Sequence, residues 1–206
     1  MRFTRLLPIL AVVALAGAAC GASDTGSSAS DPAPSATPAS DHNQADIGFL
    51  QGMIPHHAQA IEMSDLALER SDNPRVVDLA RRINAAQGPE IEQMEGLLQQ
   101  WGVEAAGGGE SGGGEDHGGH GGGHGGGGGH EGMLSEEELT ALEAAEGAEF
   151  ERSFLNGMIA HHRGAVVTSQ TELREGQSPE AKELAQAIID AQEAEIAEME
   201  QLLNEI

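Results

Sequence analysis

The chain has 206 residues, and its 10 Lys and Arg against 34 Asp and Glu give a formal net charge of -24. This charge argues against a nucleic-acid partner, because phosphate binding needs a cationic surface. Aromatic residues make up only 2% of the chain, which disfavours a β-sandwich or barrel rich in aromatic strand pairs. We expect one domain of moderate size together with disordered segments.

Residues 1–20 are typical of a bacterial secretion signal that ends in a cysteine. Arg2 and Arg5 supply the positive start, and an apolar stretch follows that is too short to form a stable membrane span. Small residues then precede Cys20, as in a lipobox. The pattern predicts export and a lipid anchor on Cys20 at the extracytoplasmic side of the cell membrane. Ordinary cleavage after Ala18 is the alternative.

Two segments of low sequence complexity are predicted to be disordered. Residues 21–42 are dominated by Ser, Ala, Pro, Thr and Gly, and they form a linker between the anchor and the domain. Residues 104–134 form a Gly/His-rich loop. Histidines on a flexible chain can gather Cu(II), Ni(II) or Zn(II) without selecting a geometry, although the loop can also be a simple spacer. These histidines are His117, His120, His124 and His130.

The remaining regions, residues 43–103 and 135–206, carry the same pattern at a constant shift of 105 residues. The sequence Phe-Leu-x-Gly-Met-Ile-x-His-His begins at Phe49 and again at Phe154. Further matches follow without a gap, up to Leu98 in the first region and its counterpart in the second. A register this long predicts an internal duplication, in which each copy is one structural unit.

Each copy is predicted to form a hairpin of two helices. In the first copy, Asp41 with Gln44 is expected to cap a helix that runs to about residue 70. Asn73-Pro74 then combines a cap with proline at the first helical position, which predicts a second helix to about residue 101.

The second copy repeats these signals. Ser135 and Glu138 form a capping box, and Ser178-Pro179 repeats the cap followed by proline. Apolar residues recur with the helical period in both copies, and neither copy shows the alternation of a strand. The predicted fold is therefore all-α, a four-helix bundle built from two duplicated helical hairpins.

One face of the first helix in each copy gathers histidine and methionine. The second helix carries an apolar stripe that is interrupted by a Gln and a Glu, which are costly in a core unless they are satisfied. Thr168 stands in the second copy where the first has Met63. The candidate metal ligands are Met53, His56, His57, Met63, Met94, Met158, His161, His162 and Met199, with Gln87, Glu90, Gln192 and Glu195 behind them.

Imidazole together with thioether is the ligand set that suits copper, above all Cu(I). A purely structural network is the main alternative, in which the Glu residues hydrogen-bond the histidines and fix the register of the bundle. A ferritin-like oxidoreductase is disfavoured, because no histidine of the pairs is preceded three residues earlier by Glu. We therefore expect a protein that is not an enzyme.

The repeated Phe-x-x-x-Met-x-x-His-His-x-x-Ala core, followed by Gln-x-x-Glu-x-x-x-Met on the next helix, resembles the CopM-like DUF305 family of domains. The resemblance covers residues 46–101 and 150–203, as two tandem copies. It implies a ferritin-like four-helix bundle in an exported bacterial protein. Some members bind copper through Met and His, which here implies the methionine and histidine ligands named above. The expected function is copper sequestration or buffering, with the metal ion and the membrane as partners.

Overall fold

The computed structural model describes residues 41–105 and 131–206, and within these residues it is helical without any strand. The helices are α1 (Gln44–Arg70), α2 (Pro74–Gln100), α3 (Glu136–Ala144), α4 (Gly147–Glu175) and α5 (Pro179–Leu203). The predicted secretion signal and lipid anchor, residues 21–40 of the predicted linker, and the four loop histidines lie outside the described residues.

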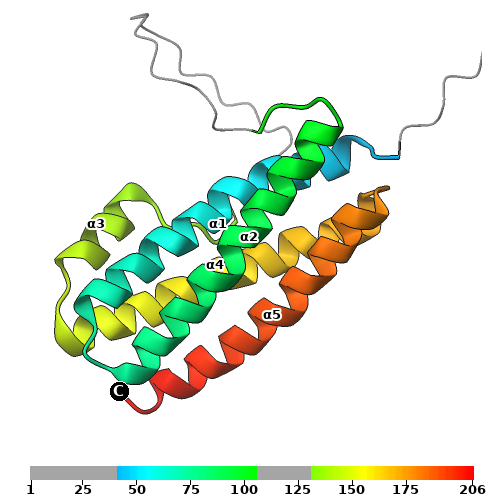
Figure 1. The fold of residues 1–206 in the computed structure, drawn as a ribbon. Coiled ribbons are helices and arrows are strands. Elements are labelled where there is room, and N and C mark those ends of the chain that lie inside the picture. Colours follow the sequence, from blue (N-terminus) through cyan, green and yellow to red (C-terminus); the bar gives the residue numbers. More distant parts are fainter. Residues whose placement is uncertain (1–40, 106–130) are drawn as a thin grey trace, which may run out of the picture. The chain divides into compact units, whose positions relative to one another are not determined.

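The four long helices form two hairpins that pack against each other (Figure 1). Helix α1 pairs with α2, and α4 pairs with α5. The hairpins meet mainly where α1 packs on α4, and these two helices run in opposite directions. The predicted all-α four-helix bundle is confirmed, and the short helix α3 packs on α4 as an addition to it.

The two hairpins start their second helices in the same way. Asn73 accepts a hydrogen bond from the backbone of Arg75, and Ser178 accepts one from Ala181. Each cap is followed by a proline in the first turn, where the missing N–H costs nothing. The caps predicted from sequence at these two helices are therefore confirmed.

The starts of the first helices differ from the prediction. Helix α1 is capped by Asn43 rather than Asp41, and Asp46 rather than Gln44 closes the capping box. In the second copy the box of Ser135 and Glu138 is present, but it starts only the short helix α3. The chain then turns at Gly147, whose φ of 55° is one that other residues rarely adopt, and α4 begins there.

Two groups of apolar side chains make up the core. The first group includes Phe150, Phe154 and Leu79, and the second includes Phe49, Leu50 and Leu98. The large residues at the centre of both groups are fully or almost fully buried. The histidines belong to neither apolar group, although they are equally buried, so the core contains a polar layer.

Candidate metal centre

The four histidines of the two repeated pairs lie in the interior of the bundle. His56 and His57 come from α1, His161 and His162 come from α4, and each has an exposed fraction of 0%. The rings of His56 and His161 face each other across the two helices, with centroids 3.8 Å apart and planes tilted by 42°. The interior layer therefore joins the two hairpins at the level of the histidine pairs.

Each pair contributes one histidine to a hydrogen bond with the second helix of its own hairpin. His57 Nε2 lies 2.8 Å from Glu90 Oε2, and His162 Nε2 lies 2.7 Å from Glu195 Oε2. A carboxylate can only accept, so Nε2 carries the proton in both rings. Nδ1 is then left with a lone pair, and neither Nδ1 atom has a hydrogen-bond partner in the described structure.

A carboxylate behind a histidine is the arrangement that orients imidazole ligands in metal sites. The carboxylate fixes the tautomer and makes the opposite nitrogen a better donor of its lone pair. Glu90 and Glu195 keep 19% and 14% of their side chains exposed, so each links a fully buried ring to the surface. In the structure, Glu90 and Glu195 are thus hydrogen-bond partners of His57 and His162.

Other buried polar groups repeat at the same shift of 105 residues. The side-chain amides of Gln87 and Gln192, and the hydroxyls of Ser64 and Ser169, have no hydrogen-bond partner in the described structure. Leaving such a group unsatisfied costs about 1–3 kcal/mol. A core built for stability alone would replace these groups by apolar ones.

The five candidate methionines are fully buried, but they divide between the two apolar groups. Met53 and Met94 lie in one group, whereas Met63, Met158 and Met199 lie in the other. Met63 reaches towards α4, since a Cβ atom added at Gly157 would lie 3.2 Å from its terminal methyl carbon. The helical wheel grouped Met63 with Met53, and the structure instead places it with the methionines of the second hairpin.

His161 is held in its neutral form. Burial first, and then the proximity of the other three histidines, lower the pKa of His161 to about 2. A neutral imidazole keeps the lone pair that a metal ion requires.

Comparison with known proteins places the chain in a family. The model of the domain of unknown function DUF305 matches residues 46–203 in one continuous stretch that spans both hairpins. The chain belongs to the DUF305 family.

Solved structures of several DUF305 proteins are similar to this one. A DUF305 fragment from Deinococcus radiodurans is 33% identical, with a TM-score of 0.65, over 80% of this chain and 98% of the fragment. A presumed secreted DUF305 protein from Streptomyces coelicolor is 29% identical, with a TM-score of 0.66, over 78% of this chain and 93% of the other. CopM in its Cu(I)-bound form is 30% identical, with a TM-score of 0.61, over 79% of this chain and 98% of CopM.

CopM has also been solved with Cu(II), with silver and in the apo form. Among curated proteins, uncharacterized protein L153 of Acanthamoeba polyphaga mimivirus is 42% identical over 55 residues. This match covers 27% of the present DUF305 chain and 36% of the viral protein.

Within the residues that the structure describes, methionine sulfur is available beside the histidines of this DUF305 protein. Within residues 41–105 and 131–206, no three His, Cys, Asp or Glu side chains converge closely enough to hold an ion by themselves. The histidine layer offers at most pairs of such ligands, and the buried neighbours that can complete a site are the methionines.

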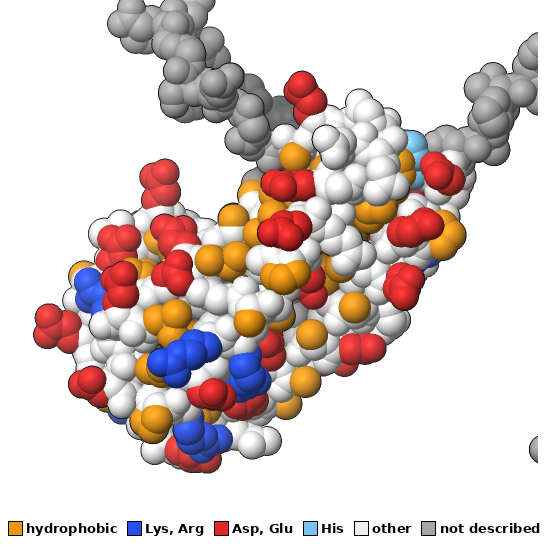
Figure 2. All heavy atoms as spheres, viewed as in Figure 1, with side chains coloured by type: hydrophobic (Ala, Val, Ile, Leu, Met, Phe, Trp, Pro, Cys, Tyr) orange, Lys and Arg blue, Asp and Glu red, His pale blue; other side chains and the backbone are white. Residues whose placement is uncertain are grey.

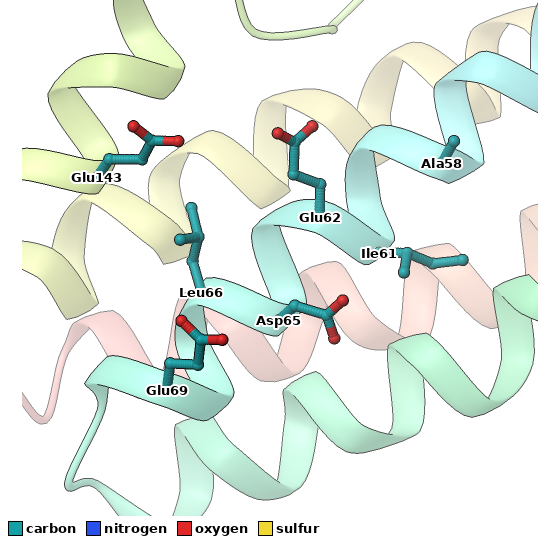
Figure 3. A pocket seen from close by; sticks show the side chains of 7 residues that line it. All are labelled: Ala58, Ile61, Glu62, Asp65, Leu66, Glu69 and Glu143. Carbon is teal, nitrogen blue, oxygen red and sulfur yellow. The ribbon is translucent and has the colours of Figure 1, made fainter.

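On the face of the family domain seen in Figure 2, acidic side chains are more widespread than Lys and Arg. A surface pocket of about 360 Å³ lies over α1 and α3, and it is lined by four carboxylates from Glu62, Asp65, Glu69 and Glu143 (Figure 3). None of the predicted metal ligands lines this pocket. In the part of the chain described here, no helix has the length and apolarity needed to span a membrane.

Sequence reasoning missed one group of residues beside the histidines. The carbonyl oxygen of Glu131 lies 3.1 Å from His56 Nε2, and Gln59 binds the backbone of Leu134. Met133, a half-buried methionine, lies between these two contacts in the sequence. The one signal in the sequence was a departure from the repeat, because Gln59 in the first copy corresponds to Gly164 in the second.

Proposed function

We propose that this protein binds copper in the interior of the bundle, with Cu(I) as the preferred ion, and sequesters or buffers it without catalysing a reaction. One observation carries the proposal. In both hairpins a buried histidine donates Nε2–H to a glutamate, so a lone pair remains on a buried Nδ1 atom that has no protein partner in the described structure.

The neighbouring thioethers make this donor set soft. Met53 precedes His57 by four residues and Met158 precedes His162 by four, so each methionine shares a helix face with its histidine. Met94 and Met199 are buried on the second helices of the two hairpins. Imidazole and thioether ligands favour Cu(I) over hard ions such as Mg²⁺ or Ca²⁺, which require oxygen ligands.

The solved relatives support the same assignment. CopM has been solved with Cu(I), Cu(II) and silver, and its fold is shared along nearly its whole length. Silver(I) has the same charge and softness as Cu(I), which is consistent with a site that selects by ligand type.

A structural role is the second candidate, and the His–Glu hydrogen bonds favour it. The bonds of His57 to Glu90 and of His162 to Glu195 would by themselves fix the register of the bundle. This candidate leaves the buried amides of Gln87 and Gln192 without an explanation.

We further propose that the protein is exported and held at the outer side of the membrane by a lipid on Cys20. The basis is the sequence of residues 1–20, together with the likeness to a presumed secreted relative. Expression in a bacterial host with detergent phase separation tests it. The wild-type chain is expected in the detergent phase and Cys20→Ala in the aqueous phase, whereas equal partition of the two would contradict the anchor.

Competitive Cu(I) titration tests the metal site. The four loop histidines are first changed to alanine, so that only the bundle can bind. Replacing Met94 and Met199 by leucine then removes two thioethers while the core volume is nearly kept. We expect Cu(I) affinity to fall at least about tenfold, which corresponds to about 1.4 kcal/mol.

The matched control is Leu142→Ile, a swap of similar size in the core at α3, a helix that carries none of the candidate ligands. It should leave Cu(I) affinity unchanged. Two results would contradict the copper proposal and leave the interior as a structural network. In the first, the chain without loop histidines fails to take Cu(I) from a chelator of weak affinity. In the second, the double leucine variant binds Cu(I) as tightly as the chain with Met94 and Met199.

A further inference from the structure

The backbone of residues 131–134 lies against α1 and α4 beside the buried histidine pair, and we call this segment the strap. At its first residue, the carbonyl oxygen of Glu131 accepts a hydrogen bond from His56 Nε2 at 3.1 Å. At its last residue, the Gln59 amide donates to the carbonyl of Leu134 at 2.9 Å and accepts from its N–H at 2.8 Å. The strap is therefore fastened to α1 at both ends.

On the side of α4 the strap lies directly on backbone. A Cβ atom added at Gly164 would lie 1.7 Å from the Glu131 carbonyl oxygen and 2.9 Å from the Gly132 nitrogen. Gly132 itself has a φ of 83°, and a Cβ atom there would lie 2.5 Å from the carbonyl oxygen of Ala160. Both contacts are possible only because these residues lack a side chain.

The strap also explains why the two copies differ at this point. Gln59 and Gly164 occupy the same position of the repeat, 105 residues apart, while the neighbouring histidines are identical in the two copies. The first copy supplies a side chain that holds the strap, and the second supplies the space in which the strap lies.

The strap covers the histidine pair at the contact between the hairpins. His56 and His161 are completely buried, and the strap carbonyl is hydrogen-bonded to the first of them. The strap is also short and non-helical, and it is held by these hydrogen bonds and by the partly buried side chain of Leu134, whereas the flanking helices are joined by many fully buried side chains of the apolar core. Segments with few buried contacts open at lower free energy than packed helices.

We propose that the strap is the gate through which a soft monovalent cation reaches the buried histidines. The hydrogen bonds of Gln59 hold it closed, and the missing side chain of Gly164 leaves the space in which it lies. This proposal rests on the proposed function. Opening the strap frees His56 Nε2 and uncovers the pair without moving α1 away from α4. The strap also carries Met133, which places a thioether at the gate itself.

The test compares Gly164→Ala with Gly88→Ala in the full-length chain that has alanine at the four loop histidines. The first substitution places a methyl group where the strap lies, whereas a Cβ atom at Gly88 meets nothing within 4 Å. Stopped-flow transfer of Cu(I) from the protein to a chelator gives the release rate, and diethyl pyrocarbonate modification of the metal-free protein, read by mass spectrometry, gives the accessibility of His56.

Gly164→Ala is expected to speed both Cu(I) release and His56 modification by about tenfold or more, the effect of losing two or three net hydrogen bonds. Gly88→Ala should match its parent chain in both rates. If Gly164→Ala folds poorly, Gln59→Leu removes both hydrogen bonds to Leu134 at similar side-chain volume and should raise the same two rates.

The outcomes separate the two claims. If the chain with alanine at the four loop histidines binds Cu(I) but neither Gly164→Ala nor Gln59→Leu changes the release rate or the modification of His56, the gate is wrong and the copper site stands. If the chain with alanine at the four loop histidines does not bind Cu(I), the copper site and the gate are both wrong.

Discussion

Asp46 and Glu172 form a pair of buried carboxyl groups where α1 begins and α4 ends. Asp46 accepts hydrogen bonds from the backbone N–H groups of Asn43, Gln177 and Ser178. Burial acts to raise the pKa of Asp46, but these bonds outweigh it and leave the pKa below its usual value. For Glu172, burial first and then the neighbouring Asp46 raise the pKa to about 8. Glu172 therefore stays protonated at neutral pH beside an ionised Asp46.

This pair predicts a pH dependence of stability. Between the ordinary pKa of about 4.5 and the raised value of about 8, the unfolded chain releases the Glu172 proton while the folded chain keeps it. The free energy of unfolding should therefore fall as the pH rises through this window, and the contribution of Glu172 should level off above it. Glu172→Gln removes this dependence, because glutamine can donate to Asp46 without titrating.

Urea denaturation of both chains from pH 5 to pH 9 measures the difference. The titrations of all other groups cancel in the difference between the two chains. We expect the stability of Glu172→Gln relative to the wild-type chain to rise steadily across the window. A difference between the two chains that stays constant with pH would show that Glu172 is ionised in the folded protein, contrary to this account.

At the scale of the helices, the two apolar groups of the core hold unequal sets of sulfur ligands. Met63 extends from α1 into the group that holds Met158 and Met199, and Thr168 occupies the equivalent position in the other hairpin. The group with Met63 therefore holds three buried thioethers, whereas the other group holds Met53 and Met94.

We predict that the chain without loop histidines binds Cu(I) in two steps of different affinity. The tighter step belongs to the apolar group with three methionines, because an additional thioether adds a soft ligand. Met63→Leu should weaken the tighter step by about tenfold and leave the weaker step unchanged. Isothermal titration in the presence of a competing chelator separates the two steps, and an equal loss in both would contradict the asymmetry.

The sequence predicted those elements whose signals are local. The caps at Asn73 and Ser178, the bounds of α2, the start of α5 and the buried histidine face follow from short-range rules and the helical period. The cap of α1 was placed wrongly at Asp41, because the choice of Asn43 depends on Asp46 and its distant contact with Ser178. The break before α4 was missed because alanine and glutamate favour helix at that point, and the turn rests on Gly147 alone.

The arrangement of the candidate site needed the tertiary structure. A helical wheel correctly placed the histidines inside, but it describes one helix at a time. Met63 packs with Met158 and Met199, and the strap contacts His56. Both features arise where α1 packs on α4. In the sequence, the one sign of the contact between the strap and the helices is the difference between Gln59 and Gly164 at equivalent positions of the repeat.

At the scale of the whole bundle, a bound ion should stabilise the fold by mass action. If Ag(I), a redox-stable analogue of Cu(I), binds only the folded chain, a free concentration of 100 times its dissociation constant adds about 2.7 kcal/mol to the free energy of unfolding. Thermal denaturation of the chain without loop histidines should therefore show a higher Tm with Ag(I). His57→Ala with His162→Ala should remove the increase, and a bundle with a purely structural network would melt at the same temperature with and without silver.

X-ray absorption at the copper edge tests the central claim most directly, with Cu(I) loaded into the chain that has alanine at His117, His120, His124 and His130. The account predicts a coordination shell of imidazole nitrogen and thioether sulfur, in which the sulfur contribution falls when Met94 and Met199 are replaced by leucine. A shell of nitrogen and oxygen alone, unchanged by those two substitutions, would show that copper binds elsewhere and that the buried histidines and methionines serve the fold.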